Sequence, residues 1–186
     1  MPPKSKLSKQ DIIEVAVDIV RKQGEQGLNA RSIATALGCS TQPIFSNFTS
    51  MEELYSCVIK RADEINRAYI DNEISRGEFP PYKASGMAYI RFAKEETELF
   101  KLLYMRNRQD EDIPKDHALT NQMENLVQGN TGLEGDSAKL FHLEMWACVH
   151  GIATMFVTGF IDLRWELVSQ MLTDIFQGLN QRYNKE

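Results

Sequence analysis

Apolar residues recur at intervals of three and four along most of the 186-residue chain, with polar and charged residues between them. Ile13, Ala16, Val17 and Val20 illustrate the pattern, because they share one side of a segment that ends at Gly24. This period is typical of amphipathic helices, and the long alternating runs expected of strands are absent. The pattern therefore predicts an all-α protein.

The segments after residue 50 predict longer helices than those before it. One is expected from residue 51 to the polar stretch 71–81, and a nearly all-apolar helix over 82–95 should be central in the fold. Shorter helices are predicted to begin at Thr97 and to pass through Met123 to Gly129. A long helix capped by residues 136–137 and a last one over 165–183 complete the prediction.

Residues 29–48 contain two short helical segments separated by a tight turn. Gly38 suits the residue after a helix end, where a left-handed backbone is required, and Ser40 is a candidate N-cap for the second segment. Ile44 and Phe48 supply an apolar side through which the second segment can pack. The arrangement predicts a helix-turn-helix, whose second helix lies in the DNA major groove.

Two further helix starts flank this motif. Ser8 with Asp11, and Ser50 with Glu53, have the spacing of capping boxes, in which the two residues satisfy each other's backbone N–H groups. The order is thus three short helices followed by a long fourth one.

This order, with its residues, resembles the DNA-binding domain of the TetR family of bacterial regulators. A second match, Trp146 followed by His150 and Gly151, is similar to a signature of some ligand-binding domains in that family. We call the N-terminal segment with this resemblance the head and the rest of the chain the body. The matching residues of the first segment are Ile33-Ala34, Leu37-Gly38-Cys39-Ser40, Phe45, Phe48 and Glu52-Glu53-Leu54.

The resemblance implies a DNA-binding domain over residues 1–50 and an effector-binding and dimerisation domain over residues 51–186. It implies a homodimeric repressor that binds a double-stranded DNA operator and is released by a small-molecule effector. No cofactor is implied.

The predicted DNA contacts lie on the second helix of the motif and on a basic N-terminal arm. Gln42 can form a paired contact with adenine, and Pro43 or Phe45 can touch a thymine methyl group. The lysines of the arm fit phosphate contacts and a solvated tail equally well. The predicted DNA-binding residues are Lys4, Lys6, Lys9, Arg31, Ser40, Thr41, Gln42, Pro43, Phe45, Ser46 and Asn47.

Three residues depart from the family pattern. Phe45 replaces a common tyrosine, Asn47 a common histidine or tyrosine, and Met51 the usual lysine. Each replacement removes a contact to the DNA backbone rather than to a base. They leave one alternative open, an interaction protein that binds a protein partner through a weakened head.

The charge distribution agrees with a DNA-binding head. The whole chain carries a net charge of −5, yet residues 1–50 carry +2 and the remainder −7. Such an asymmetry favours contact with DNA at the head and disfavours it at the body.

The body concentrates aromatic and methionine side chains. Ordinary core packing explains most of them individually, whereas the resemblance implies that part of the set lines an effector cavity. The predicted effector-binding residues are Tyr89, Phe92, Phe100, Tyr104, Met123, Met145, Trp146 and His150. Dimerisation is expected through the last two helices, with Met155, Phe156, Leu172, Ile175 and Phe176 as anchors.

Other functions find little support. The sequence contains none of the common hydrolase, phosphate-binding or metalloprotease motifs, so we expect no enzyme. His142 and His150 are two helical turns apart, too far to share a metal ion.

The apolar stretch 145–163 contains polar residues and lacks basic flanks at its start, which favours a packed helix over a membrane span. Without a signal-peptide pattern, we expect a cytoplasmic protein whose Cys39 and Cys148 are buried thiols.

Overall fold

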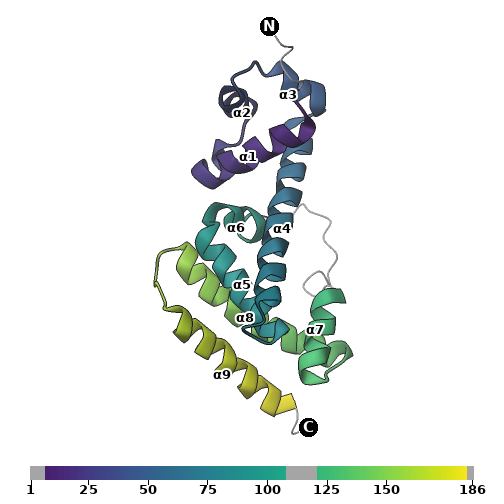
Figure 1. Cartoon of the computed structure of the whole chain (residues 1–186), viewed down its shortest axis with the longest axis vertical. Coiled ribbons are helices and arrows are strands. Elements are labelled where there is room, and N and C mark those ends of the chain that lie inside the picture. Colours follow the sequence, from purple (N-terminus) through teal and green to yellow (C-terminus); the bar gives the residue numbers. More distant parts are fainter. Residues whose placement is uncertain (1–6, 108–120, 184–186) are drawn as a thin grey trace. The chain divides into compact units, whose positions relative to one another are not determined.

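The computed structural model describes residues 7–107 and 121–183, which contain nine α-helices and no strand (Figure 1). The predicted all-α class is confirmed. The residues up to Asn66 together with Glu96–Arg106 form one compact unit, and Arg67–Glu95 together with the residues from Asn107 onward form a second.

The first unit gathers the short helices around the beginning of the long one. It contains α1 (Lys9–Gln23), a 3-10 turn (Glu25–Gly27), α2 (Ala30–Leu37), α3 (Gln42–Asn47), the first part of α4 (Met51–Arg76) and α6 (Thr97–Tyr104) (Figure 1). α4 begins at Met51, directly after the predicted domain boundary, but the compact unit continues to Asn66 and takes in Glu96–Arg106, where α6 packs against α1. The domain boundary at residue 50 stays a prediction. Its buried apolar residues include Ile12, Ala16, Val20, Ile33, Ile44, Phe48, Leu54, Val58, Leu99 and Phe100.

The capping residues predicted at the helix ends are partly confirmed. Ser8 and Asp11 form the predicted capping box, and Gly38 adopts the left-handed conformation with φ of 64°. The Ser50 hydroxyl accepts from the Glu53 N–H at 3.3 Å, but the Glu53 carboxylate accepts from the backbone N–H of Thr49 instead of that of Ser50.

The predicted N-cap at Ser40 is wrong. α3 begins at Gln42, and Thr41 occupies the N-cap position without a side-chain hydrogen bond. Pro43 at the second helical position explains why the cap is dispensable, because proline has no N–H group that needs an acceptor.

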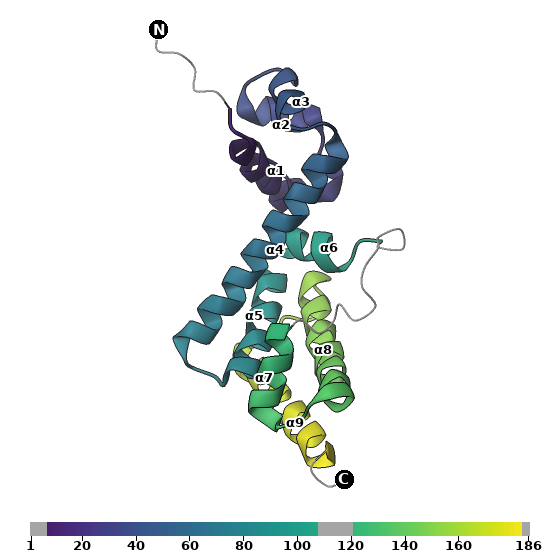
Figure 2. The same ribbon diagram turned by 90° about the vertical axis from the view of Figure 1, so that its right-hand side faces the viewer.

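The second unit is built around α5. It contains the end of α4, α5 (Pro81–Glu95), α7 (Asn121–Thr131), α8 (Gly135–Val157) and α9 (Trp165–Tyr183). α5 packs against α7, α8 and α9, as predicted for a central helix, and α8 also contacts α7 and α9 (Figure 2). Two helix boundaries differ from the prediction: Gly129 lies inside α7, and α8 begins at Gly135 with no side-chain cap.

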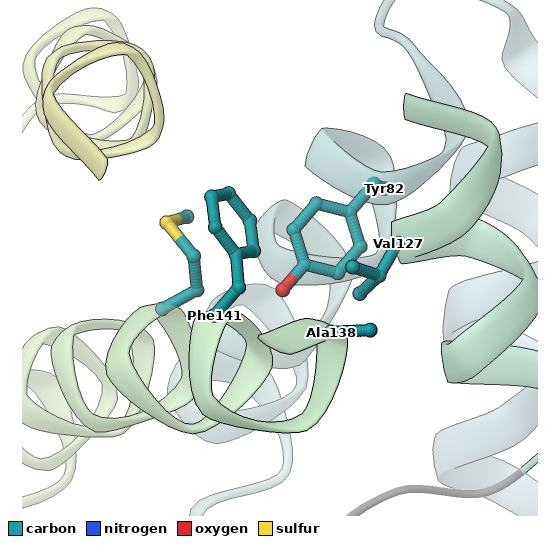
Figure 3. Packing of buried hydrophobic residues seen from close by; sticks show 5 residues of the cluster. Tyr82, Val127, Ala138 and Phe141 are labelled. Carbon is teal, nitrogen blue, oxygen red and sulfur yellow. The ribbon is translucent and has the colours of Figure 1, made fainter. Parts of the chain in front are cut away.

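Apolar packing holds α5, α7, α8 and α9 together at one end of this unit. Tyr82 and Phe141 lie side by side with Val127 and Ala138 (Figure 3). The Phe141 ring meets Phe176 of α9 edge to face, with ring centroids 5.5 Å apart. Aromatic pairs in this geometry add to the stabilisation that comes from area burial alone.

Among the described residues, one helix is long and apolar enough to cross a membrane by length and composition: α8. A core helix of a globular protein passes the same test, and α8 packs against three other helices of its unit. Only 39% of its apolar window is buried, so these contacts account for one part of its apolar surface. The sequence-based prediction of a packed helix is supported for that part, and packing at a subunit interface stays a prediction for the rest.

We expect Phe141→Ala to lower the free energy of unfolding by about 3–5 kcal/mol, because it opens a cavity among four helices. The matched control is Phe160→Ala, since Phe160 is 76% exposed and its loss should change stability by less than about 0.5 kcal/mol. Urea denaturation followed by circular dichroism measures both changes. Similar midpoints for the two variants would contradict the described packing.

Candidate nucleic-acid interface and ligand-binding region

The turn between α2 and α3 has the geometry of a helix-turn-helix. Asn29 caps α2 through its side-chain oxygen, which accepts from the backbone N–H groups of Arg31 and Ser32. At the other end, the Cys39 N–H donates to the Ala34 carbonyl at 3.0 Å, and Gly38 turns the chain toward α3. Local hydrogen bonds therefore determine where α2 ends and α3 can begin.

α3 buries one side and exposes the other. Ile44 and Phe48 at its end are buried, whereas Gln42, Phe45 and Ser46 are exposed. Of the remaining predicted DNA contacts, Ser40 and Arg31 are exposed, and Thr41, Pro43 and Asn47 are half-buried. The structure thus brings the predicted contacts of residues 40–47 together on one short segment.

Two of these polar side chains are engaged by their own helix. The Ser46 hydroxyl donates to the Gln42 carbonyl at 2.9 Å, and the Asn47 amide donates to the Pro43 carbonyl at 2.8 Å. The Ser46 hydroxyl proton and one of the two Asn47 amide protons are therefore directed at the backbone of α3.

Lys9 is exposed, and its side chain is engaged by other residues of the first unit. Its ammonium group donates to Glu53 at 2.6 Å and lies 4.7 Å from the centre of the Phe48 ring. The hydrogen bond from Lys9, together with those from Thr49, lowers the pKa of the Glu53 carboxyl to about 2. A phosphate contact by Lys9 would have to compete with this pair. Lys4 and Lys6 of the predicted arm lie outside the described residues.

An ion pair that the sequence analysis missed joins α1 to the residue before α6. Arg21 donates to both carboxylate oxygens of Glu96, each at 2.9 Å, and also to Asp18 at 3.0 Å. Two-point guanidinium–carboxylate contacts combine charge attraction with a defined geometry. Because 75 residues separate Arg21 from Glu96, no local sequence pattern could have revealed the pair.

In the second unit, two tyrosine–histidine hydrogen bonds cross from α5 to α8. Tyr82 Oη lies 3.0 Å from His142 Nδ1, and Tyr89 Oη lies 2.9 Å from His150 Nδ1. Burial raises the pKa of Tyr82 and lowers that of His150, so both are held in their neutral forms at pH 7.

Three predicted effector-binding residues meet at the second of these bonds. The Trp146 ring stacks on the His150 ring, with centroids 5.0 Å apart and planes 22° from parallel, while Tyr89 bonds to the same histidine. Trp146 also retains an exposed edge. An apolar stack with polar tips suits the orientation of an aromatic ligand.

The other predicted effector-binding residues have further described contacts. Phe92 is fully buried against Tyr69, Met145 belongs to the packing around Phe141, and Met123 is half-buried on α7. Phe100 and Tyr104 belong to the first unit, where their rings pack together and Tyr104 accepts a hydrogen bond from Asn66.

The predicted dimer anchors largely serve the chain's own packing. Leu172 is only 2% exposed and lies close to Gly86, and Ile175 and Phe176 pack against the cluster around Phe141. Phe156 stacks on Trp165, and Met155 is half-buried. The exposed large apolar residues of α8 and α9 are instead Leu140, Leu143, Trp146 and Leu167.

A buried carboxylate is a further feature that the sequence analysis missed. Glu73 is 2% exposed, and its Oε2 accepts from Arg76 at 3.3 Å and lies 3.4 Å from the Arg91 Nε atom. Its Oε1 has no hydrogen-bond partner within the described part of the chain. The Arg91 guanidinium also covers the Trp165 ring at 4.7 Å. No spacing in the sequence distinguishes this glutamate from those at the surface.

Two of the three cysteines were predicted to be buried, and the structure places them differently. Cys39 and Cys148 are half-buried, as is Cys57, and all three are free thiols. Within the described ranges, no group of three or more potential metal ligands is assembled.

Comparison with known proteins identifies relatives of both units. Residues 82–175, just over half of the chain, match the family described as "Tetracyclin repressor-like, C-terminal domain". A curated relative described as an uncharacterized HTH-type transcriptional regulator from Mycobacterium tuberculosis is 25% identical over 162 residues, covering 85% of this chain and 74% of the relative.

Solved structures share the fold. A TetR-like transcriptional regulator from Rhodococcus sp. RHA1 superposes with a TM-score of 0.65 at 15% identity, covering 95% of each chain. The multidrug binding protein EbrR complexed with malachite green gives a TM-score of 0.62 at 16% identity, covering 90% of this chain and 96% of EbrR. Together with the helix-turn-helix geometry and the match of the C-terminal domain, these relatives show that the chain belongs to the TetR family of transcriptional regulators.

Proposed function

We propose that the protein is a cytoplasmic, homodimeric repressor that binds a DNA operator and leaves it when a small molecule binds the second unit. The observation that carries this proposal is the α2–α3 motif, with its left-handed Gly38 and with Gln42, Phe45 and Ser46 exposed on α3. The named relatives are transcriptional regulators, so the alternative of a protein-binding head is not favoured.

The DNA contacts follow from the exposed side of α3. Gln42 carries an amide that matches the adenine edge in the major groove, and Thr41 and Ser46 stand beside it with smaller polar groups. Arg31, Lys4 and Lys6 supply charge for the phosphates. One helix of six residues reads few base pairs, so two copies about 34–36 Å apart would read two half-sites of a palindromic operator.

The effector site that we propose centres on Tyr89, Trp146 and His150. Their stacked rings and shared hydrogen bond form a local apolar surface with polar tips. EbrR, which shares the fold, binds malachite green, a compound with several aromatic rings. A flat aromatic compound that stacks on Trp146 is therefore the effector class that we propose for this chain.

Selection of bound fragments from a random pool of duplex DNA tests the central claim. The expected result is a palindromic motif whose half-sites are about one helical turn apart. Binding should also weaken steeply as salt is raised, because phosphate contacts release counterions. Enrichment of no motif, with binding equal to that of scrambled DNA, would refute the proposal.

We expect Gln42→Ala to relax selection at one position of each half-site and to reduce discrimination there by about 1–3 kcal/mol. Folding should be unaffected, since Gln42 is exposed. Repeating the DNA selection with the variant measures the change. An unchanged motif would mean that another residue reads that base pair.

We expect Met51→Lys to steepen the plot of log K against log salt by about 0.9 for each phosphate that the new lysine neutralises. Met51 is the first residue of α4, where the family usually presents a lysine. The matched control is Asn72→Lys, which adds the same charge at an exposed position of the second unit. Titrations on one operator at several salt concentrations measure the slopes. Equal slopes for both variants would show that position 51 does not face the DNA backbone.

We expect the protein to sediment as a dimer at micromolar concentration through α8 and α9. Leu143→Asp should favour the monomer, because Leu143 is an exposed apolar residue of α8 and burial of an unpaired carboxylate at an interface is costly. Analytical ultracentrifugation of the parent and the variant measures the equilibrium. A parent that sediments as a monomer would contradict the proposed dimer.

A further inference from the structure

Phe45 is a large apolar side chain on the outer side of α3, and it is 52% exposed. Its neighbour Ile44 is fully buried, so Phe45 lies on a side of α3 that is turned away from the core of the first unit. Single exposed apolar residues are common on protein surfaces. This one is distinguished by its position three residues after Gln42, on the same side of the helix that carries the proposed DNA contacts.

The polar residues next to Phe45 are shorter than Gln42 and are partly engaged by their own helix. Ser46 and Asn47 each donate one hydrogen bond to a carbonyl group of α3, at 2.9 and 2.8 Å, which draws their side chains toward the helix backbone. Pro43 is half-buried. The outer side of α3 therefore presents one long amide, Gln42, and one aromatic ring, Phe45.

An aromatic ring can discriminate between bases without forming a hydrogen bond. In the major groove, thymine carries a C5-methyl group where cytosine carries only a hydrogen atom. A phenyl ring against the methyl group excludes water from two apolar surfaces. Against cytosine, the ring would lose this apolar contact, because the methyl group is absent.

We propose that Phe45 is a specificity-determining residue, whose ring selects thymine in each half-site by contact with the C5-methyl group. The selected thymine lies beside the base pair read by Gln42. This inference rests on the proposed function, because it requires that α3 enters the major groove. It assigns to Phe45 a role in base selection that a phosphate-binding tyrosine at the same position would not have.

Deoxyuridine provides a direct test, because it lacks only the methyl group of thymine and keeps every hydrogen-bonding group. The operator found by selection is synthesised with deoxyuridine in place of each thymine in turn, and the dissociation constant is measured for each duplex. At one position in each half-site, we expect the parent protein to bind about four-fold more weakly, the effect of losing one buried methyl group.

Variants then assign this effect to Phe45. In Phe45→Ala, the ratio of dissociation constants for uracil and thymine at that position should fall to about one. In Phe45→Leu, which remains apolar, part of the ratio should persist. Gln42→Ala should retain the ratio, as should Phe160→Ala, which removes a similarly exposed ring from the second unit. Circular dichroism confirms that each variant is folded.

The outcomes separate this inference from the proposed function. If the parent binds its operator but no deoxyuridine substitution weakens binding, or if Phe45→Ala keeps the full ratio, Phe45 does not read thymine and DNA binding stands. If selection enriches no motif at all, the proposed function fails and this inference fails with it.

Discussion

α3 has six residues, fewer than an isolated helix needs to persist in water. It exists because Ile44 and Phe48 are buried in the core of the first unit, and this burial also decides which residues face outward. With Ile44 inside, Gln42 and Phe45 are left on the outer side. The side that we propose contacts DNA is thus a consequence of how the apolar side packs.

The second unit depends on polar groups paired inside apolar packing. A buried tyrosine hydroxyl or histidine nitrogen is costly unless it has a hydrogen-bond partner. Tyr82 and Tyr89 on α5 meet His142 and His150 on α8, so the two bonds define how these helices are aligned. A ligand that displaces Tyr89 or stacks on Trp146 would act directly on that alignment. The proposed effector site therefore includes one of these hydrogen bonds between α5 and α8.

The first unit contains its own structural connection to α6. Arg21 binds Glu96 through two hydrogen bonds, and a Cβ atom added at Gly24 would lie 2.8 Å from the Glu98 carboxylate. Glu96 follows directly on α5, the helix that carries Tyr89. The Arg21–Glu96 contact therefore ties α1 to the residue at which the chain leaves α5.

The sequence by itself determined the helical class, the positions of most helices and the helix-turn-helix, because these follow from the spacing of apolar residues and from local caps such as Ser8 and Gly38. Contacts between residues that are far apart in the sequence could be identified only from the tertiary structure. The pairing of Lys9 with Glu53, the Arg21–Glu96 contact and the burial of Glu73 join residues that no local pattern connects. The same is true of α8, which is apolar on several sides, so that only packing decides which side is buried and which carries Leu140 and Leu143 to the surface. Short-range spacing encodes helices, whereas the choice of contacts between helices is made by the whole fold.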